Sequence, residues 1–182
     1  MGNSFKTILK QTSKDFKNRS VNPPLVRTST MVFKSMNDLR QTQKKSLKNP
    51  RGGYFDYGRQ GTSTTLELEK LLTKLEESYH TFLTPTGFGA VFLTLFSILR
   101  PGDELIVADP VYSPTRNLTE KYLKDFHIIA KFYDPNDLST IKKNITNKTK
   151  LIYVENPGSN SFEFQDLSKI ISIAKKYKLF SV

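Results

Sequence analysis

The chain has no cysteine, no tryptophan and only two histidines among its 182 residues. The missing cysteines exclude disulfide bonds, thiolate zinc sites, iron–sulfur ligation and a cysteine nucleophile. The two histidines, His80 and His127, are far apart in the sequence, so we expect no histidine-rich metal site. Long apolar runs are missing too: the longest, residues 88–99, is interrupted by Thr94 and Ser97 and is too short to cross a bilayer.

Targeting signals are also missing from the N-terminus. Its early lysines have no apolar stretch behind them, so the segment is not a secretory signal. It begins like a myristoylation site, but Lys6 stands where serine or threonine is needed. We therefore expect a cytoplasmic protein with no membrane segment. Its 37% hydrophobic and 25% charged residues are typical of a globular protein.

Positive charge is concentrated at one end of the chain. The total formal charge is +11, of which residues 1–53 contribute +10 and residues 54–182 contribute +1. We therefore predict a basic N-terminal arm over residues 1–53. Such an arm can hold nucleic acid, but it offers few aromatic rings for base stacking. We prefer a solvated, lysine-rich extension and do not expect nucleic acid as a partner.

Residues 54–182 alternate strand-like runs with helical patterns. The runs are short, apolar or β-branched, and bounded by Pro, Gly, Asp or Asn. The predicted strands are residues 81–84, 104–108, 128–133, 151–155 and 179–182. This alternation predicts an α/β fold with a mostly parallel sheet and flanking helices.

Helical patterns lie between these strands. Leucines at helical spacing predict a helix over residues 68–79, with Thr64 and Glu67 at the capping-box interval before it. Residues 87–99 are apolar nearly all round, which predicts a buried helix. Ser113 is predicted to cap a helix that has proline in its first turn.

Two further segments, one before residue 54 and one near the end of the sequence, complete the prediction. Residues 165–178 form a further amphipathic helical pattern, and residues 41–49 are polar and typical of a loop. The last predicted strand, residues 179–182, coincides with the end of the sequence, so no crossover helix follows it. Because ligands of open α/β sheets bind beyond the carboxyl ends of the strands, we expect a domain that is truncated at its C-terminus.

One segment is typical of an anion site. Residues 82–90 predict a strand, a tight turn and a helix start, and the glycines at positions 87 and 89 let a ligand approach the backbone. Free N–H groups at the helix N-terminus attract an anion such as phosphate. The segment is not a dinucleotide fingerprint, because Phe92 stands where the third glycine belongs. A plain turn with glycine at a helix start explains the same residues equally well.

Three other loops carry polar or aromatic side chains. Tyr57 and Arg59 lie two apart ahead of a predicted helix, where both can donate to a phosphate, although most surface arginines bind nothing specific. Tyr112 follows a strand, where its ring either stacks on a planar cofactor or packs under the loop. A stretch from Glu155 to Ser159 follows the next strand. We expect these loops to converge on one crevice.

Together the loops resemble the Cys/Met-metabolism family of pyridoxal-phosphate enzymes, and within it the cystathionine β-lyases most closely. The resemblance runs over residues 23–182 and implies the large domain of fold-type I enzymes. It implies that Tyr57 and Arg59 reach across a dimer interface to the cofactor phosphate of the neighbouring subunit. It also implies that backbone N–H groups at Gly87 and Phe88 hold the phosphate of their own subunit.

The same resemblance assigns two further residues. Tyr112 matches the tyrosine that stacks on the pyridine ring and is a candidate for proton transfer. Ser159 matches a serine near the cofactor, within a Glu155–Asn156–Pro157–Gly158–Ser159 stretch that has Asn156 in place of the usual Ser or Thr. The Schiff-base lysine of the family is absent from this chain, as are the aspartate and arginine that follow in the family. We therefore expect the isolated chain to be inactive.

The resemblance implies pyridoxal 5′-phosphate as cofactor and a cystathionine-like sulfur amino acid as substrate. The implied reaction is β-elimination of cystathionine to homocysteine, pyruvate and ammonia, as in transsulfuration and methionine biosynthesis, by a homodimer or homotetramer when full length. A γ-lyase or γ-synthase of the same family is an alternative. A basic nucleic-acid-binding module and a non-catalytic remnant are alternatives from other classes.

Overall fold

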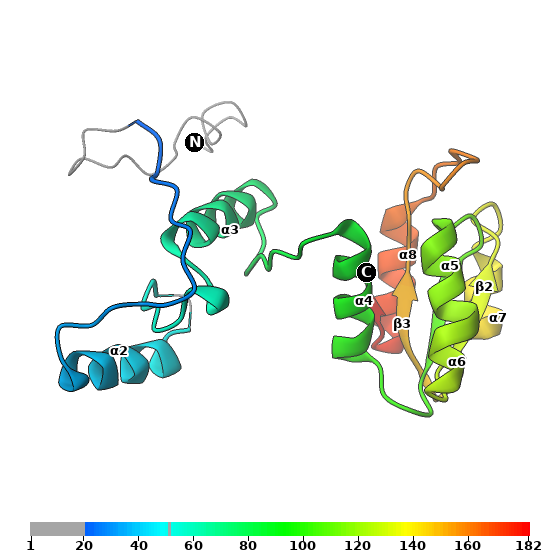
Figure 1. Ribbon diagram of the computed structural model, residues 1–182. Helices are drawn as coiled ribbons and strands as arrows, with labels where there is room; N and C mark the ends of the chain where they lie inside the picture. Colours follow the sequence, from blue (N-terminus) through cyan, green and yellow to red (C-terminus); the bar gives the residue numbers. More distant parts are fainter. Residues whose placement is uncertain (1–20, 51) are drawn as a thin grey trace. The chain divides into compact units, whose positions relative to one another are not determined.

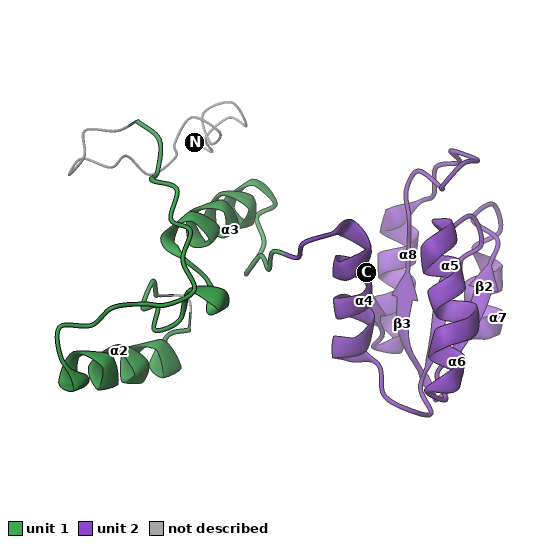
Figure 2. Ribbon diagram, in the orientation of Figure 1, with its two compact units in different colours: residues 1–83 green, residues 84–182 purple. Residues whose placement is uncertain are grey.

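The computed structural model describes residues 21–50 and 52–182. The chain forms two compact units, residues 1–83 and 84–182, which Figure 2 shows in green and purple. The division of the structure falls after Leu83, whereas the boundary predicted after residue 53 rests on charge and stays a prediction. Residues 1–20 of the basic arm lie outside the described residues.

The described part of the first unit contains three helical elements. They are α2 (Met36–Lys48), the 3₁₀ helix η1 (Gly58–Gln60) and α3 (Ser63–Leu75). The extended segment before α2 is tied to the later elements. The N–H of Val26 donates to Thr64 Oγ1 at 2.8 Å, and Thr30 forms an antiparallel bridge with Tyr57.

Helix α2 corrects the prediction of a loop over residues 41–49. Its N-cap is Ser35, whose hydroxyl accepts a hydrogen bond from the N–H of Asp38 at 3.1 Å. Asp38 in the first turn, and Lys45 and Lys48 in the last, complement the helix dipole. No residue of α2 is buried. The polar composition that suggested a loop is that of an exposed helix made of good helix formers.

The N-cap of α3 lies two residues before the predicted one. Thr62 is the N-cap, and its N–H donates to the hydroxyl of Thr65 at 2.9 Å. The hydroxyl of Thr64 instead accepts a hydrogen bond from the N–H of Val26. Oε1 of Glu67 forms an ion pair with Lys70 Nζ at 3.3 Å. The Thr64–Glu67 capping box was therefore wrong, because a second threonine pair at the same spacing starts the helix.

The second unit is built on a four-stranded parallel sheet in the order β2-β1-β3-β4. Leu105 lies opposite Ala130 of β2 on one side and Leu151 of β3 on the other. This arrangement confirms the predicted parallel sheet. The strands are β1 (Glu104–Ala108), β2 (Ile129–Tyr133), β3 (Thr149–Tyr153) and β4 (Phe180–Ser181).

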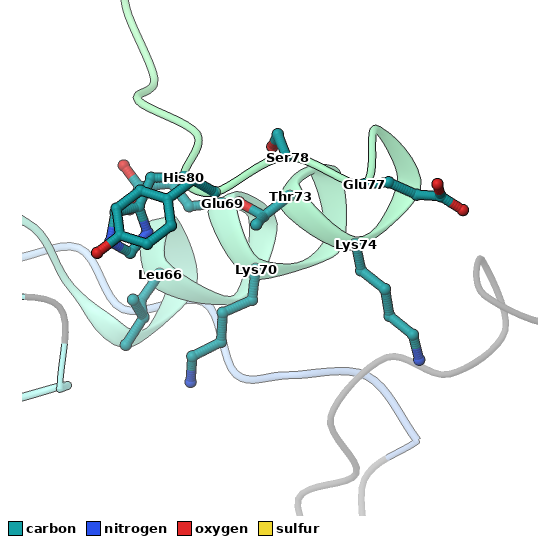
Figure 3. Close-up of a pocket in the computed structure, with 9 residues that line it drawn as sticks. Leu66, Glu69, Lys70, Thr73, Lys74, Glu77, Ser78 and His80 are labelled. Atoms are coloured by element: carbon teal, nitrogen blue, oxygen red, sulfur yellow. The ribbon is translucent and has the colours of Figure 1, made fainter.

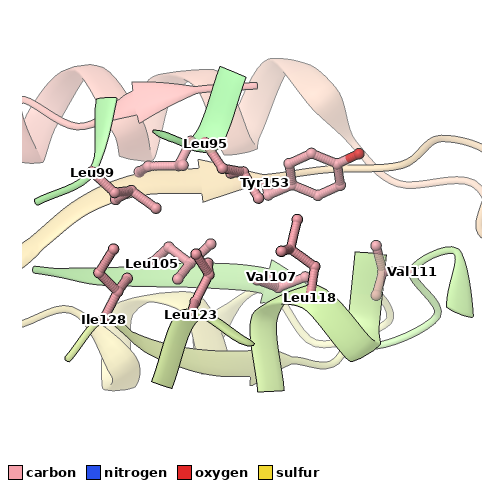
Figure 4. Close-up of a cluster of buried hydrophobic side chains, with 10 residues drawn as sticks. Leu95, Leu99, Leu105, Val107, Val111, Leu118, Leu123, Ile128 and Tyr153 are labelled. Carbon is pink, nitrogen blue, oxygen red and sulfur yellow. The ribbon is translucent and has the colours of Figure 1, made fainter. Parts of the chain in front are cut away.

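Helices cover both faces of this sheet (Figure 1). One face packs on α4 (Gly87–Ile98) and on the continuous helical segment α5 (Ser113–Asn117), η2 (Leu118–Tyr122) and α6 (Leu123–Asp125). The other face packs on α7 (Ser139–Asn144) and α8 (Leu167–Tyr177). Figure 4 shows the first of the two cores, where Leu95, Leu105 and Leu123 are fully buried. Every residue of β1 is buried. Leu105 to Ala108 form an unbroken apolar run, as a strand covered on both faces requires, and the carboxylate of Glu104 accepts hydrogen bonds from Lys131 and Thr146.

Two further predictions, one at the junction of the two units and one in the second unit, were wrong. Residues 81–84 are described and form no strand, because the described chain places no neighbouring strand beside them to share hydrogen bonds. Helix α4 is not buried all round: Leu95 is its only buried residue, and Phe92 and Leu93 are 44% and 50% exposed. Among the described residues, only the side of α4 that faces the sheet is covered.

The start of α5 and both ends of α8 agree with the predictions to within a few residues. Tyr112 rather than Ser113 is the N-cap of α5, and Pro114 lies in its first turn as predicted. Asp166 caps α8 by accepting the N–H of Lys169 at 3.0 Å, and Lys178 ends it in a left-handed conformation. Among the described residues, no helix has the length and apolar character needed to cross a membrane.

Candidate functional site

The predicted site residues of the second unit lie at one edge of its sheet. Strands β1, β2 and β3 are parallel, so their carboxyl ends share that edge. Helix α4 leads through a short turn into β1 and therefore runs antiparallel to it, which brings its N-terminus to the same edge (Figure 1). Gly87, Phe88, Tyr112 and Ser159 thus belong to one region of the unit. The sequence analysis expected four loops to converge on one crevice; three of them lie at this edge, and the fourth, with Tyr57 and Arg59, belongs to the first unit.

The N-terminus of α4 presents free backbone donors. The hydroxyl of the N-cap, Thr86, accepts the N–H of Gly89 at 2.9 Å. Within the described chain, the N–H groups of Gly87 and Phe88 donate to no protein atom. A Cβ added at Gly87 would meet nothing within 4 Å, so the first turn is open to a ligand. Free N–H groups and the positive end of the helix dipole are the features on which the hypothesis of an anion site rests, and that site stays a prediction.

The loop between β1 and α5 displays the predicted tyrosine. Tyr112 is 48% exposed, whereas the neighbouring Val111 is buried in the core. The N–H of Tyr112 donates to Glu155 Oε2 at 2.8 Å. The carboxylate of Glu155 therefore joins the loop after β1 to the segment after β3.

The segment after β3 turns sharply back toward β1. Its Asn156–Pro157 peptide bond is cis. The N–H of Ser159 donates to the carbonyl of Pro110 at 2.8 Å, so Ser159 lies beside the Tyr112 loop. Gly158 is buried, and a Cβ there would lie 2.8 Å from the carboxylate of Glu163. A side chain at Gly158 would therefore require the carboxylate of Glu163 to move.

A buried polar network beneath the edge was not predicted from the sequence. The phenol of Tyr133 donates to Gln165 Oε1, and the amide of Gln165 donates to the carbonyl of Glu155 at 2.8 Å. The N–H of Gln165 also donates to Asn156 Oδ1 at 2.8 Å. Burial raises the pKa of Tyr133, which keeps its proton on this hydrogen bond. A polar residue such as Gln165 next to an apolar helical pattern was the available signal, but its partner is 32 residues away in sequence.

Tyr153 is also hydrogen-bonded to this network, through Glu155. Its phenol donates to Glu155 Oε1 at 3.3 Å. Burial first, and then the nearby negative charge of Glu155, raise the pKa of Tyr153. The phenol therefore stays neutral and remains a donor to the carboxylate that holds the Tyr112 loop.

Tyr57 and Arg59 lie in the first unit. The guanidinium of Arg59 stacks over the ring of Tyr57, 4.8 Å from its centroid. The N–H of Gly58 donates to the carbonyl of Ser29 at 2.8 Å, which fastens the loop to the extended segment. The structure thus brings Tyr57 and Arg59 together.

A separate groove lies beside α3 in the first unit (Figure 3). Lys70 and Lys74 project from the same side of the helix there, and the rings of His80 and Tyr79 contact each other in a tilted arrangement, with centroids 4.5 Å apart and an interplanar angle of 58°. None of the predicted site residues lines this groove. The described residues also contain no group of three His, Asp or Glu side chains suited to a metal ion.

The chemistry of the edge fits a phosphorylated aromatic ligand. The open N-terminus of α4 suits a phosphate, and the exposed ring of Tyr112 suits a planar heterocycle. The family comparison points the same way, since the sequence profile described as Cys/Met metabolism PLP-dependent enzyme matches residues 5–182. The chain belongs to this family. Membership brings the cofactor PLP (pyridoxal 5′-phosphate) and confirms the family predicted from the four loops.

Individual members of the family are similar over nearly the whole chain. A Saccharomyces cerevisiae protein provisionally named cystathionine beta-lyase is 35% identical over 162 residues, 89% of this chain and 45% of that protein. The structure of cystathionine gamma-lyase from Lactobacillus plantarum, complexed with L-serine, is 27% identical with a TM-score of 0.83 and covers 98% of this chain. The structure of cystathionine gamma synthase from Xanthomonas oryzae pv. oryzae, with aminoacrylate and cysteine, is 26% identical with a TM-score of 0.85 and covers 100%.

The match covers only part of each relative. The chain spans 45% of the yeast protein and 44% of each of the two structures. These structural likenesses confirm the predicted α/β fold of the PLP-dependent enzymes.

Proposed function

We propose that the second unit carries the phosphate- and ring-binding part of the PLP site of a carbon–sulfur lyase. The observation that supports this most directly is the open N-terminus of α4 at the same sheet edge as the exposed ring of Tyr112. PLP supplies the chemistry of the family by acting as an electron sink for charge at the substrate's α-carbon. The protein groups hold and orient it.

Each predicted residue has a defined task in this proposal. The N–H groups of Gly87 and Phe88 hold the cofactor phosphate, and the ring of Tyr112 stacks on the pyridine. The Tyr112 hydroxyl is a candidate for moving a proton near the reacting carbon, and Ser159 lies beside the same loop. Tyr57 and Arg59 supply phosphate donors to the neighbouring subunit of a homodimer or homotetramer.

The proposed reaction is β-elimination of cystathionine to homocysteine, pyruvate and ammonia, a step of transsulfuration and methionine biosynthesis in the cytoplasm. The 35% identity with a protein named as a β-lyase supports it. The γ-lyase and γ-synthase structures support the second candidate, a γ-elimination or γ-replacement enzyme. The protein isolated from its source cell is assayed with cystathionine, and its intact mass is compared with the 20.8 kDa of this chain. Pyruvate as product favours β-elimination, and 2-oxobutyrate favours γ-elimination.

A variant pair at Gly87 tests the phosphate site. Gly87→Pro removes one backbone N–H at the first helical position, where proline is tolerated, and Thr86 before it is already extended. Losing a donor to a charged phosphate is expected to weaken binding by about 1.5–3 kcal/mol. Gly87→Ala keeps the N–H and meets open space, so it is the matched control. Binding is measured by calorimetry.

The ligand for this titration is pyridoxine 5′-phosphate, which has no aldehyde and so does not condense with surface lysines. We expect the parent chain and Gly87→Ala to bind it alike and Gly87→Pro to bind it about tenfold or more weakly. Equal binding by all three proteins would remove the α4 N-terminus from the phosphate site. No binding by the parent would reject the proposed function for this chain.

Arg59 is tested separately because it acts from the other unit. In the oligomeric protein from the source cell, Arg59→Ala is expected to weaken retention of PLP by about 1.5–3 kcal/mol through loss of a charge-assisted donor. Dialysis against buffer, followed by the absorbance of the retained cofactor, measures the effect. Unchanged retention would show that Arg59 does not contact the phosphate.

A further inference from the structure

The loop that carries Tyr112 is held along its backbone. The N–H of Asp109 donates to the carbonyl of Tyr133 at 2.9 Å, and the carbonyl of Pro110 accepts from Ser159 at 2.8 Å. The N–H of Tyr112 donates to Glu155 at 2.8 Å. The ring of Tyr112 is nevertheless half-exposed. A backbone held by these hydrogen bonds therefore presents a half-exposed tyrosine side chain.

One side chain joins the two ends of this loop. Arg116, in the first turn of α5, reaches back so that its guanidinium donates to the carbonyl oxygen and Oδ1 of Asp109, at 2.5 and 2.6 Å. The same guanidinium donates to Glu120 Oε1 at 2.5 Å. Its own N–H donates to the carbonyl of Tyr112 at 3.0 Å. Arg116 thus contacts the first and the last residue of the loop.

The guanidinium of Arg116 also lies over an aromatic ring. Its Cζ lies 4.1 Å from the centroid of the Phe132 ring on β2. Only a planar group with several donors can stack on that ring while bridging Asp109 and Glu120, and lysine has neither the plane nor the fork. The side chain of Arg116 is 32% exposed, whereas those of Asp109 and Glu120 are 64% and 41% exposed. The bridge therefore has its least exposed member at its centre.

We propose that Arg116 is a positioning residue for Tyr112. It closes the loop between β1 and α5 so that the ring of Tyr112 faces the ligand edge in one orientation. This inference rests on the proposed function insofar as Tyr112 stacks on the cofactor ring. The loop geometry itself is independent of that function, and the two are tested by separate measurements.

Hydrogen exchange on the whole chain tests the loop. In Arg116→Lys we expect amides of residues 109–117 to exchange at least tenfold faster, with residues 104–108 of β1 unchanged. Glu120→Gln leaves both contacts to Asp109 and is the matched control, with less than a threefold change expected. Arg116→Ala shows whether lysine rescues part of the effect. If Arg116→Ala does not fold, Asp109→Asn is measured in its place. This variant removes the carboxylate charge that pairs with Arg116.

A spectroscopic measurement separates positioning from a merely structural role. The chain has no tryptophan, so Tyr112→Trp provides a single fluorescent reporter at the position of interest. Pyridoxine 5′-phosphate is expected to quench this reporter by stacking on it. Adding Arg116→Lys is expected to lower the maximal quenching at least twofold, while the dissociation constant measured by calorimetry changes less than threefold. A general loss of structure would weaken both.

The outcomes distinguish the two proposals. Unchanged exchange of residues 109–117 in Arg116→Ala would overturn the positioning role, whatever the ligand does. Faster exchange spread equally over β1 would also overturn it, because the role would then be global stability. Localised exchange with no binding of pyridoxine 5′-phosphate by the parent would leave the loop role standing and reject the proposed function.

Discussion

Replacing Glu104 with alanine is expected to lower the free energy of unfolding by about 2–4 kcal/mol. Glu104 is 8% exposed at the start of β1, and its Oε2 accepts hydrogen bonds from Lys131 Nζ at 2.7 Å and Thr146 Oγ1 at 2.6 Å. Alanine leaves the partly buried ammonium of Lys131 without its carboxylate. Urea unfolding followed by circular dichroism measures the change. A loss below 0.5 kcal/mol, on the order of an exposed ion pair, would contradict this account.

The same carboxylate predicts a pH dependence of stability. Burial by itself raises the pKa of Glu104, but hydrogen bonds from Lys131 and Thr146 and the charges of Lys131 and Lys148 outweigh it, so the pKa is lowered. A lowered folded-state pKa contributes stability that is complete above the unfolded value of about 4.3 and is lost as the pH falls through the folded value. Glu104→Gln is the matched control. The difference in free energy of unfolding between the parent and Glu104→Gln is expected to be constant near neutral pH and to shrink below about pH 4.

Replacing Gly58 with alanine is the second change expected to have a large effect. A Cβ at this position would lie 2.0 Å from the carbonyl oxygen of Thr28, which is backbone and cannot rotate away. The loop must move, at a cost of about 1–3 kcal/mol or more. It would carry Tyr57 and Arg59 with it, because both flank Gly58. Hydrogen exchange of residues 55–62 and thermal unfolding measure the two effects.

Gly87→Ala provides the contrast for Gly58→Ala. The same added methyl group meets nothing within 4 Å at Gly87, so stability is expected to be unchanged or slightly higher. If Tyr57 and Arg59 hold the cofactor phosphate as proposed, Gly58→Ala in the protein from the source cell is also expected to reduce PLP retention as strongly as Arg59→Ala. Unaltered exchange and unaltered melting in Gly58→Ala would show that the contact with Thr28 relaxes without moving the loop.

The sequence alone determined the fold class and the family. Strands β1, β2 and β3 are mainly apolar segments bounded by turn residues, and β1 matches its predicted bounds, residues 104–108. A buried parallel strand must be apolar on both faces, which makes it recognisable without its neighbours. Four motifs in a fixed order identified the family, because together they constrain the sequence more than any one of them.

Only the tertiary structure decided which segments have partners. Residues 81–84 resemble a strand, but the described chain offers them no neighbouring strand, and the apolar helix α4 has cover on one side alone. Residues 41–49 needed the cap at Ser35 to be recognised as helical. The contacts of Arg116 and Gln165 likewise depend on the fold. Arg116 on α5 binds Asp109 just after β1, and Gln165 binds Tyr133, which is 32 residues away in sequence. Local pattern specifies what a segment can become, whereas hydrogen-bond and packing partners depend on which segments the fold brings together.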